Sequence, residues 1–122
     1  SLPALVKASR IQDKAASAGF DWDRSEQVFE KVQEEIEELH QEVKLQDQTR
    51  IEAEFGDVLF SLINYARFID VDPESALERT NKKFIKRFQY LETEAKKNGE
   101  SLKDMTLAQM DVYWNQSKDH FK

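Results

Sequence analysis

Two pairs of acidic residues, each with a spacing of three, are the residues of this sequence best suited to chemistry. Glu35 and Glu38 form the first pair, and Glu54 and Asp57 form the second, with fifteen residues between the pairs. On a helix, a spacing of three places two side chains next to each other on one face. If two antiparallel helices joined by a short turn carry these pairs, the four carboxylates meet. They then repel one another strongly unless a cation neutralises them.

Oxygen ligands alone favour a hard divalent cation, so we expect Mg²⁺ or Mn²⁺ at these carboxylates. The sequence has no cysteine, and its two histidines, His40 and His120, lie outside the acidic motifs, where we expect them at the surface. This composition excludes thiolate metal sites. It also argues against a di-iron helical bundle, which is built on Glu-x-x-His motifs.

The acidic residues are concentrated in about a quarter of the chain. Residues 26–57 hold eleven acidic and three basic residues, a net charge of −8, whereas the whole chain carries −6. Such a block fits either a hard-cation site or a solvated helix face, and we expect Glu30 and Glu37 to be solvated. Taken alone, Glu35 and Glu38 also fit a solvated flank. The second acidic pair, on an otherwise apolar segment, favours the metal site. No overall basic patch is present, so we expect no nucleic-acid partner.

Apolar residues recur at helical spacing through nearly the whole chain, and no segment alternates as a strand would. The pattern predicts four main helices: one that ends near Gly19, one over about 26–46, one over about 50–69, and one from Pro73 that ends at Asn98-Gly99. The capping box Thr106-x-x-Gln109 predicts a last short helix through Trp114. The sequence therefore predicts a single all-α domain, a four-helix bundle with a short extra C-terminal helix.

The segment over 50–69 is apolar on almost every side. One broad apolar face is joined by Tyr65 and Phe68 on another side and by Phe60 on a third. Helices of this kind are buried all round, which in so short a chain predicts that a second subunit covers one face. We also expect four phenylalanines in the core: Phe55, Phe60, Phe84 and Phe88.

Further residues extend the acidic pattern into a resemblance to a known family. Glu34-Glu35-x-x-Glu38 followed by Glu54-x-x-Asp57 resembles the EExxE…ExxD motif of MazG-type nucleoside triphosphate pyrophosphohydrolases. Four other parts of the sequence match in the expected order: residues 14–22, 54–60 and 81–88, and Trp114. The resemblance covers nearly the whole chain and is closest to the C-terminal domain of two-domain MazG proteins.

This resemblance implies a fold, an assembly and an activity. It implies one all-α MazG domain over residues 1–122 that forms dimers, and in some cases tetramers, through helix faces. The implied activity is Mg²⁺-dependent hydrolysis of nucleoside triphosphates to the monophosphate and pyrophosphate. Carboxylate-held metal ions neutralise phosphate oxygens and activate a water for in-line attack. Glu35, Glu38, Glu54 and Asp57 would then be both metal ligands and catalytic residues.

Basic residues are the expected phosphate contacts. Lys83 and Arg87 lie one helical turn apart and are expected to bind the outer phosphates, against the alternative of a solvated basic face. Lys31 and Arg50 each precede an acidic residue by one turn. They are either phosphate contacts, as the resemblance implies, or intrahelical ion-pair partners.

The other expected substrate contacts are Glu34, Asn81 and Trp114. Asn81 contacts sugar or phosphate, or else is solvated. Trp114 resembles the residue that stacks on the nucleobase, with a core-capping role as the alternative. Trp22 fits a core plug better than a base platform.

Two other functions stay open at this point. The chain could be a relative specialised for one substrate, such as a pyrimidine deoxynucleotide or an alarmone. It could also be a catalytically weak dimerisation or partner-binding module, although a scaffold has no need of four acidic residues with Lys83 and Arg87. No apolar run is long enough to cross a membrane and no basic leader opens the sequence, so we expect a cytoplasmic protein. Ser1 in place of methionine suggests a domain of a longer protein.

Overall fold

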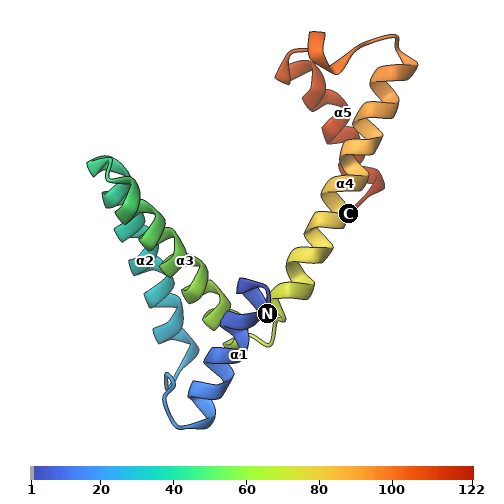
Figure 1. The fold of residues 1–122 in the computed structure, drawn as a ribbon. Helices are drawn as coiled ribbons and strands as arrows, with labels where there is room; N and C mark the ends of the chain where they lie inside the picture. Colours follow the sequence, from blue (N-terminus) through green and yellow to red (C-terminus); the bar gives the residue numbers. More distant parts are fainter. Residues whose placement is uncertain (1) are drawn as a thin grey trace. The chain divides into compact units, whose positions relative to one another are not determined.

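The computed structural model describes residues 2–122, and within that range every regular element is helical (Figure 1). The elements are α1 (Ala4–Ser17), α2 (Ser25–Leu45), α3 (Gln48–Phe68), α4 (Pro73–Lys97), the 3₁₀ turn η1 (Leu102–Asp104) and α5 (Leu107–His120). The predicted all-α class is confirmed. The predicted end of the last helix at Trp114 is wrong, because the polar residues that follow contain no glycine or proline and the helix continues to His120.

Contacts between residues divide the chain into two compact units, with the boundary between Glu74 and Ser75. The first unit holds α1, α2 and α3. The second holds nearly all of α4, together with η1 and α5. None of the described helices is long and apolar enough to cross a bilayer.

In the first unit, α2 and α3 lie side by side in opposite directions (Figure 1). The turn between them is short because Gln46 adopts a left-handed conformation, with φ 59°, which ends α2. Asp47 then caps α3, since its Oδ1 accepts a hydrogen bond from the Arg50 backbone N–H at 3.3 Å. This arrangement brings the acidic segments of the two helices together, as the sequence predicts.

Helix α1 packs on α3 and is held there by polar contacts as well as apolar ones. The Gln12 side chain donates to the backbone carbonyl of Phe60 at 3.0 Å. Arg67 of α3 donates through Nε to Asp13 and through Nη2 to Asp21, each at 3.0 Å. These bonds tie α1 and the loop after it to one side of α3. The buried apolar residues of this unit are Val28, Val32, Val58, Ile63 and Ala66.

In the second unit, aromatic side chains join α5 to α4. The rings of Phe84 and Trp114 lie 5.1 Å apart between centroids. The predicted capping box is confirmed, because Thr106 N–H donates to Gln109 Oε1 at 2.8 Å and Gln109 N–H donates to Thr106 Oγ1 at 3.2 Å. Leu91 is the largest buried apolar residue here.

Four phenylalanines expected in the core are open to solvent in this chain. Phe55, Phe60, Phe84 and Phe88 are between 38% and 57% exposed. The prediction that they are buried is wrong for the single chain, because neither three helices nor a helical hairpin is thick enough to enclose all their apolar faces. Exposed apolar side chains of this size are found on association surfaces. Dimerisation stays a prediction.

Candidate functional site

Acidic residues from α2 and α3 meet at the seam between these helices. Carboxylate oxygens of Glu35, Glu54 and Asp57 all lie within 4.8 Å of one another, and those of Glu34, Glu35 and Glu38 form a second group within the same limit. Glu35 belongs to both groups, so the two groups share one site. We call these five residues the α2–α3 acidic cluster. The expected meeting of the two acidic pairs is therefore present, while their role as metal ligands stays a prediction.

Glu35 is the most deeply placed member of the cluster, at 6% exposed. Its Oε1 accepts from Lys31 Nζ at 2.9 Å, and Lys31 also pairs with Glu34 at 3.3 Å. Hydrogen bonding to Glu35 raises the pKa of Lys31. The other oxygen, Oε2, is buried and has no hydrogen-bond partner within residues 2–122. Lys31 is thus an intrahelical partner that satisfies only half of the Glu35 carboxylate.

Glu54 also has a carboxylate oxygen without a hydrogen-bond partner within residues 2–122. Its Oε2 is buried and lacks a partner among the described residues. Loss of solvation and the negative charges of Glu38, Glu35 and Asp57 raise the pKa of Glu54. Unpaired, buried carboxylate oxygens are costly, and a cation bound between them would remove that cost. The donor set is all oxygen, so the residues fit a hard divalent ion such as Mg²⁺ or Mn²⁺.

A cavity of about 670 Å³ lies beside the cluster, within the first unit. Lys31, Glu35 and Asp57 contribute to its wall, as do Gln12 and Asn64. A volume of this size lies within the range that small-molecule and cofactor sites occupy, roughly 300–1,000 Å³. The cavity therefore offers room for an organic ligand next to the carboxylates.

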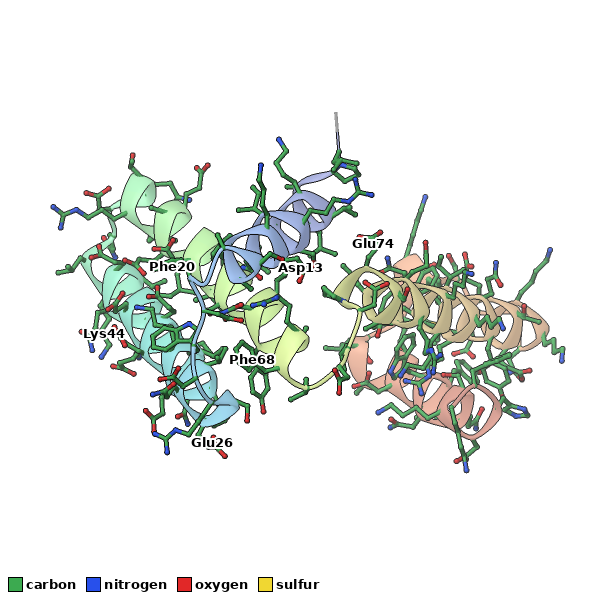
Figure 2. The ribbon with its side chains drawn as sticks, turned by 90° about the horizontal axis from the view of Figure 1, so that it is seen from below. Asp13, Phe20, Glu26, Lys44, Phe68 and Glu74 are labelled. Carbon is green, nitrogen blue, oxygen red and sulfur yellow. The ribbon has the colours of Figure 1, made fainter. Side chains whose placement is uncertain are left out.

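Two aromatic residues of the loop between α1 and α2 also line this cavity. Phe20, labelled in Figure 2, is 83% exposed, and Trp22 is 44% exposed. The interpretation of Trp22 as a core plug is wrong for the single chain, because its ring is not enclosed in the core of the first unit. Both rings are open for contact with a ligand.

Sequence reasoning assigned no role to Gln12, Asn64 or Arg67, which line the same cavity. The sequence does contain one indication: Gln12 is a polar residue within the apolar stripe of the first helix, and a polar residue buried at such a position is expected to have a specific partner. Arg67 contributes to the cavity by fixing the loop that carries Trp22, because it donates hydrogen bonds to Asp21 of that loop. These bonds also lower the pKa of the Asp21 carboxyl. No spacing rule predicts this contact across 46 residues.

The other expected substrate residues are divided between the units. Arg50, in the first unit, pairs with the helix-capping residue Asp47 at 3.7 Å. Asn81, Lys83, Arg87 and Trp114 belong to the second unit. Asn81 is exposed and Lys83 is half-buried.

Arg87 and Trp114 both contact neighbouring helices of the second unit. Arg87 Nε donates to the backbone carbonyl of Phe121 at 2.9 Å, which fixes the guanidinium. Trp114 packs on Phe84, so it caps the α4–α5 contact in this chain.

Comparison with known proteins places the chain in a family. The model of the MazG nucleotide pyrophosphohydrolase domain matches residues 24–91, which include both acidic pairs together with Lys83 and Arg87. The chain therefore belongs to the MazG family, and the recognition made from its motifs is confirmed.

Relatives agree with this assignment. The chain is 44% identical over 117 residues to the nucleoside triphosphate pyrophosphohydrolase/pyrophosphatase MazG of Thermotoga maritima, a match that covers 96% of this chain and 45% of that protein. It is 39% identical over 120 residues to the nucleoside triphosphate pyrophosphohydrolase of Escherichia coli K12, covering 97% of this chain and 46% of that protein. The chain thus spans slightly less than half the length of these two relatives.

Proposed function

We propose that this chain hydrolyses nucleoside triphosphates to the nucleoside monophosphate and pyrophosphate, with Mg²⁺ or Mn²⁺ held by the α2–α3 acidic cluster. The observation that carries the proposal is the pair of buried, unpartnered oxygens, Glu35 Oε2 and Glu54 Oε2, in one acidic group whose members Glu35 and Asp57 line a cavity large enough for a nucleotide. Family membership and the names of the relatives support the substrate class.

In this proposal Glu35, Glu38, Glu54 and Asp57 hold the metal, which supplies positive charge for phosphate oxygens and makes a water more acidic. Lys31 orients the Glu35 carboxylate, because its ammonium group occupies Oε1 and leaves Oε2 for the site. One carboxylate of the cluster accepts the proton of the attacking water.

Basic residues of α4 supply the outer-phosphate contacts of the proposal. Lys83 and Arg87 lie one turn apart, and pyrophosphate departure leaves negative charge that a positioned guanidinium stabilises. Because Arg87 Nε is bonded to Phe121, the two Nη groups are the atoms that would contact phosphate. Trp114 would stack on the base, and Asn81, Arg50 and Glu34 would be further substrate contacts.

We further propose that the active form is a cytoplasmic homodimer, or a tetramer built from such dimers. The exposed apolar side chains of α3, which include Phe55, Leu59 and Leu62, support this assembly. Covering them with a second copy removes apolar surface from water, which is the dominant favourable term in association.

A panel of nucleoside and deoxynucleoside triphosphates tests the function, with product analysis in Mg²⁺, in Mn²⁺ and in excess chelator. We expect metal-dependent release of pyrophosphate, lost in Glu35→Gln and retained in Glu37→Gln, since Glu37 is an exposed residue of α2 outside both acidic groups. Release of inorganic phosphate, or turnover without metal, contradicts the proposal. A partner-binding module would release nothing from any substrate, and a specialised relative would act on one nucleotide alone.

A further inference from the structure

Gln12 is a buried polar residue whose side-chain amide nitrogen has a hydrogen-bond partner and whose amide oxygen has none among the described residues. It lies on α1 at 6% exposed, on the side of the helix that packs against α3. Its Nε2 donates to the Phe60 backbone carbonyl at 3.0 Å. Because a carbonyl oxygen only accepts, this bond fixes which end of the amide is nitrogen. The oxygen, Oε1, must therefore be the opposite end.

Gln12 Oε1 has no partner in the part of the chain that the structure describes, although it is buried. Gln12 also lines the cavity beside the α2–α3 acidic cluster. A buried acceptor left unpaired costs free energy, and buried amide groups nearly always have partners. A donor that reached Oε1 from the cavity would remove this cost.

The rest of the cavity indicates what kind of molecule brings that donor. Lys31, Glu35 and Asp57 give it one charged part, where a phosphate chain with its cation fits. Phe20 and Trp22 give it exposed aromatic surface, on which planar rings stack. A ligand with an anionic chain, a planar ring and an N–H donor on the ring edge satisfies all three features.

We propose that Gln12 is a specificity-determining residue whose Oε1 accepts a hydrogen bond from an N–H donor on the edge of the substrate's nucleobase. This inference rests on the proposed function and deepens it by assigning base recognition to the first unit. A buried water on Gln12 is the competing occupant, and it would bring no base preference.

Deleting the donor from the base provides the direct test. Each natural nucleotide is compared with counterparts that lack an edge N–H donor: purine riboside for adenosine, 2-pyrimidinone riboside for cytidine, and 3-methyluridine for uridine. For guanosine, inosine removes the 2-amino donors and 2-aminopurine riboside removes N1–H. We expect donor deletion on the preferred base to lower kcat/KM in the unaltered protein by about 10-fold, the loss typical of a hydrogen bond that leaves a buried acceptor unpaired. Equal kcat/KM within every pair overturns the inference in favour of water.

The variant Gln12→Met completes a double-mutant cycle in which protein and substrate are each altered. Methionine has a similar length to glutamine and lacks the amide oxygen that accepts the hydrogen bond. We expect it to reduce the difference within the preferred pair to about 2-fold or less, as coupled partners require. Gln41→Met is the matched control: Gln41 is an exposed residue of α2 whose partner is Glu37, and it should keep the original ratio. An unchanged ratio in a folded Gln12→Met protein overturns the inference. If Gln12→Met does not fold, the substrate pairs in the unaltered protein still decide.

Calorimetric binding of α,β-imido triphosphates of the same pairs separates this inference from the proposed function. Selective binding without any turnover supports base recognition by Gln12 and contradicts hydrolysis. Metal-dependent pyrophosphate release with no effect of donor deletion on binding or kcat/KM contradicts only the role of Gln12.

Discussion

At the scale of single residues, burial and the neighbouring negative charges of the site raise the pKa of Glu54. The Glu54 carboxylate shares a small volume with Glu35 and Asp57 and keeps a buried oxygen without a partner among the described residues. In Glu54→Gln one negative charge is lost, so we expect the melting temperature of the metal-free protein to stay equal or rise. The increase that Mg²⁺ gives should shrink, because the protein loses a ligand. Glu52→Gln, the same change at an exposed position of α3, should leave both melting temperatures unchanged.

Activity should respond more sharply than stability to the same change. Loss of an outer partner of a metal ligand costs about 10–100-fold in affinity or activity, so loss of a ligand should exceed that. Steady-state pyrophosphate release from Glu54→Gln and Glu52→Gln measures the effect. Near-normal Mg²⁺-dependent turnover in Glu54→Gln would show that the cluster is not the metal site.

Protonation of Glu54 gives the metal-free protein a distinct pH dependence. In the folded state the pKa of Glu54 is raised above its usual value of 4.5. Between pH 4.5 and the folded-state pKa, the folded protein therefore binds more protons than the unfolded chain. The contribution of this group to stability is therefore largest below pH 4.5 and is lost as the pH rises through the folded pKa. The difference in melting temperature between the unaltered protein and Glu54→Gln, followed from pH 4 to 8 in chelator, measures it. A difference that is independent of pH would contradict the shift.

At the scale of elements, Arg67 holds α1 and the following loop against α3. Its side chain is only 17% exposed and bonds Asp21 and Asp13. We expect Arg67→Met to lower the free energy of unfolding by about 1–2 kcal/mol, since it leaves the partly buried Asp21 without its cation. Asp13→Asn should cost less, because that carboxylate is mostly exposed and exposed ion pairs contribute little. Urea unfolding compares the two variants. Hydrogen exchange should show faster exchange in α1 for Arg67→Met, and unchanged protection of α1 would contradict the role of Arg67.

Local signals predicted the elements well and their distant contacts poorly. The helix ends followed from capping residues and from glycines, as at Gly99, where φ is 68°. The meeting of the acidic pairs followed from their spacing and from a short turn. The Gln12–Phe60 contact joins residues 48 apart, so no periodicity could place it. Burial of Phe55 was predicted from apolarity alone, although burial depends on what surrounds the helix, and in this chain that side chain is exposed.

At the scale of the whole molecule, the exposed apolar side chains of α3 are the basis on which we propose a dimer. Phe55, Leu59 and Leu62 are each at least 44% exposed, while neighbouring positions of the same helix are buried. A protein that exposes such a face as a monomer is prone to associate. We therefore expect a dimer at micromolar concentration, with a urea midpoint that rises with protein concentration.

Leu62→Glu distinguishes a dimer from a stable monomer. In a monomer Leu62 is a surface residue, and a surface substitution changes the free energy of unfolding by only about 0.5 kcal/mol. In a dimer that buries this face, the same change places an unpaired charge in an apolar interface and should abolish assembly and soluble folded protein. Gln48→Glu, which adds a charge at an exposed position in the first turn of α3, is the control and should leave the assembly intact. Sedimentation equilibrium over a range of concentrations gives the result. A compact, active monomer, or a Leu62→Glu protein as stable and as large as the unaltered one, would show that α3 is not the dimer interface.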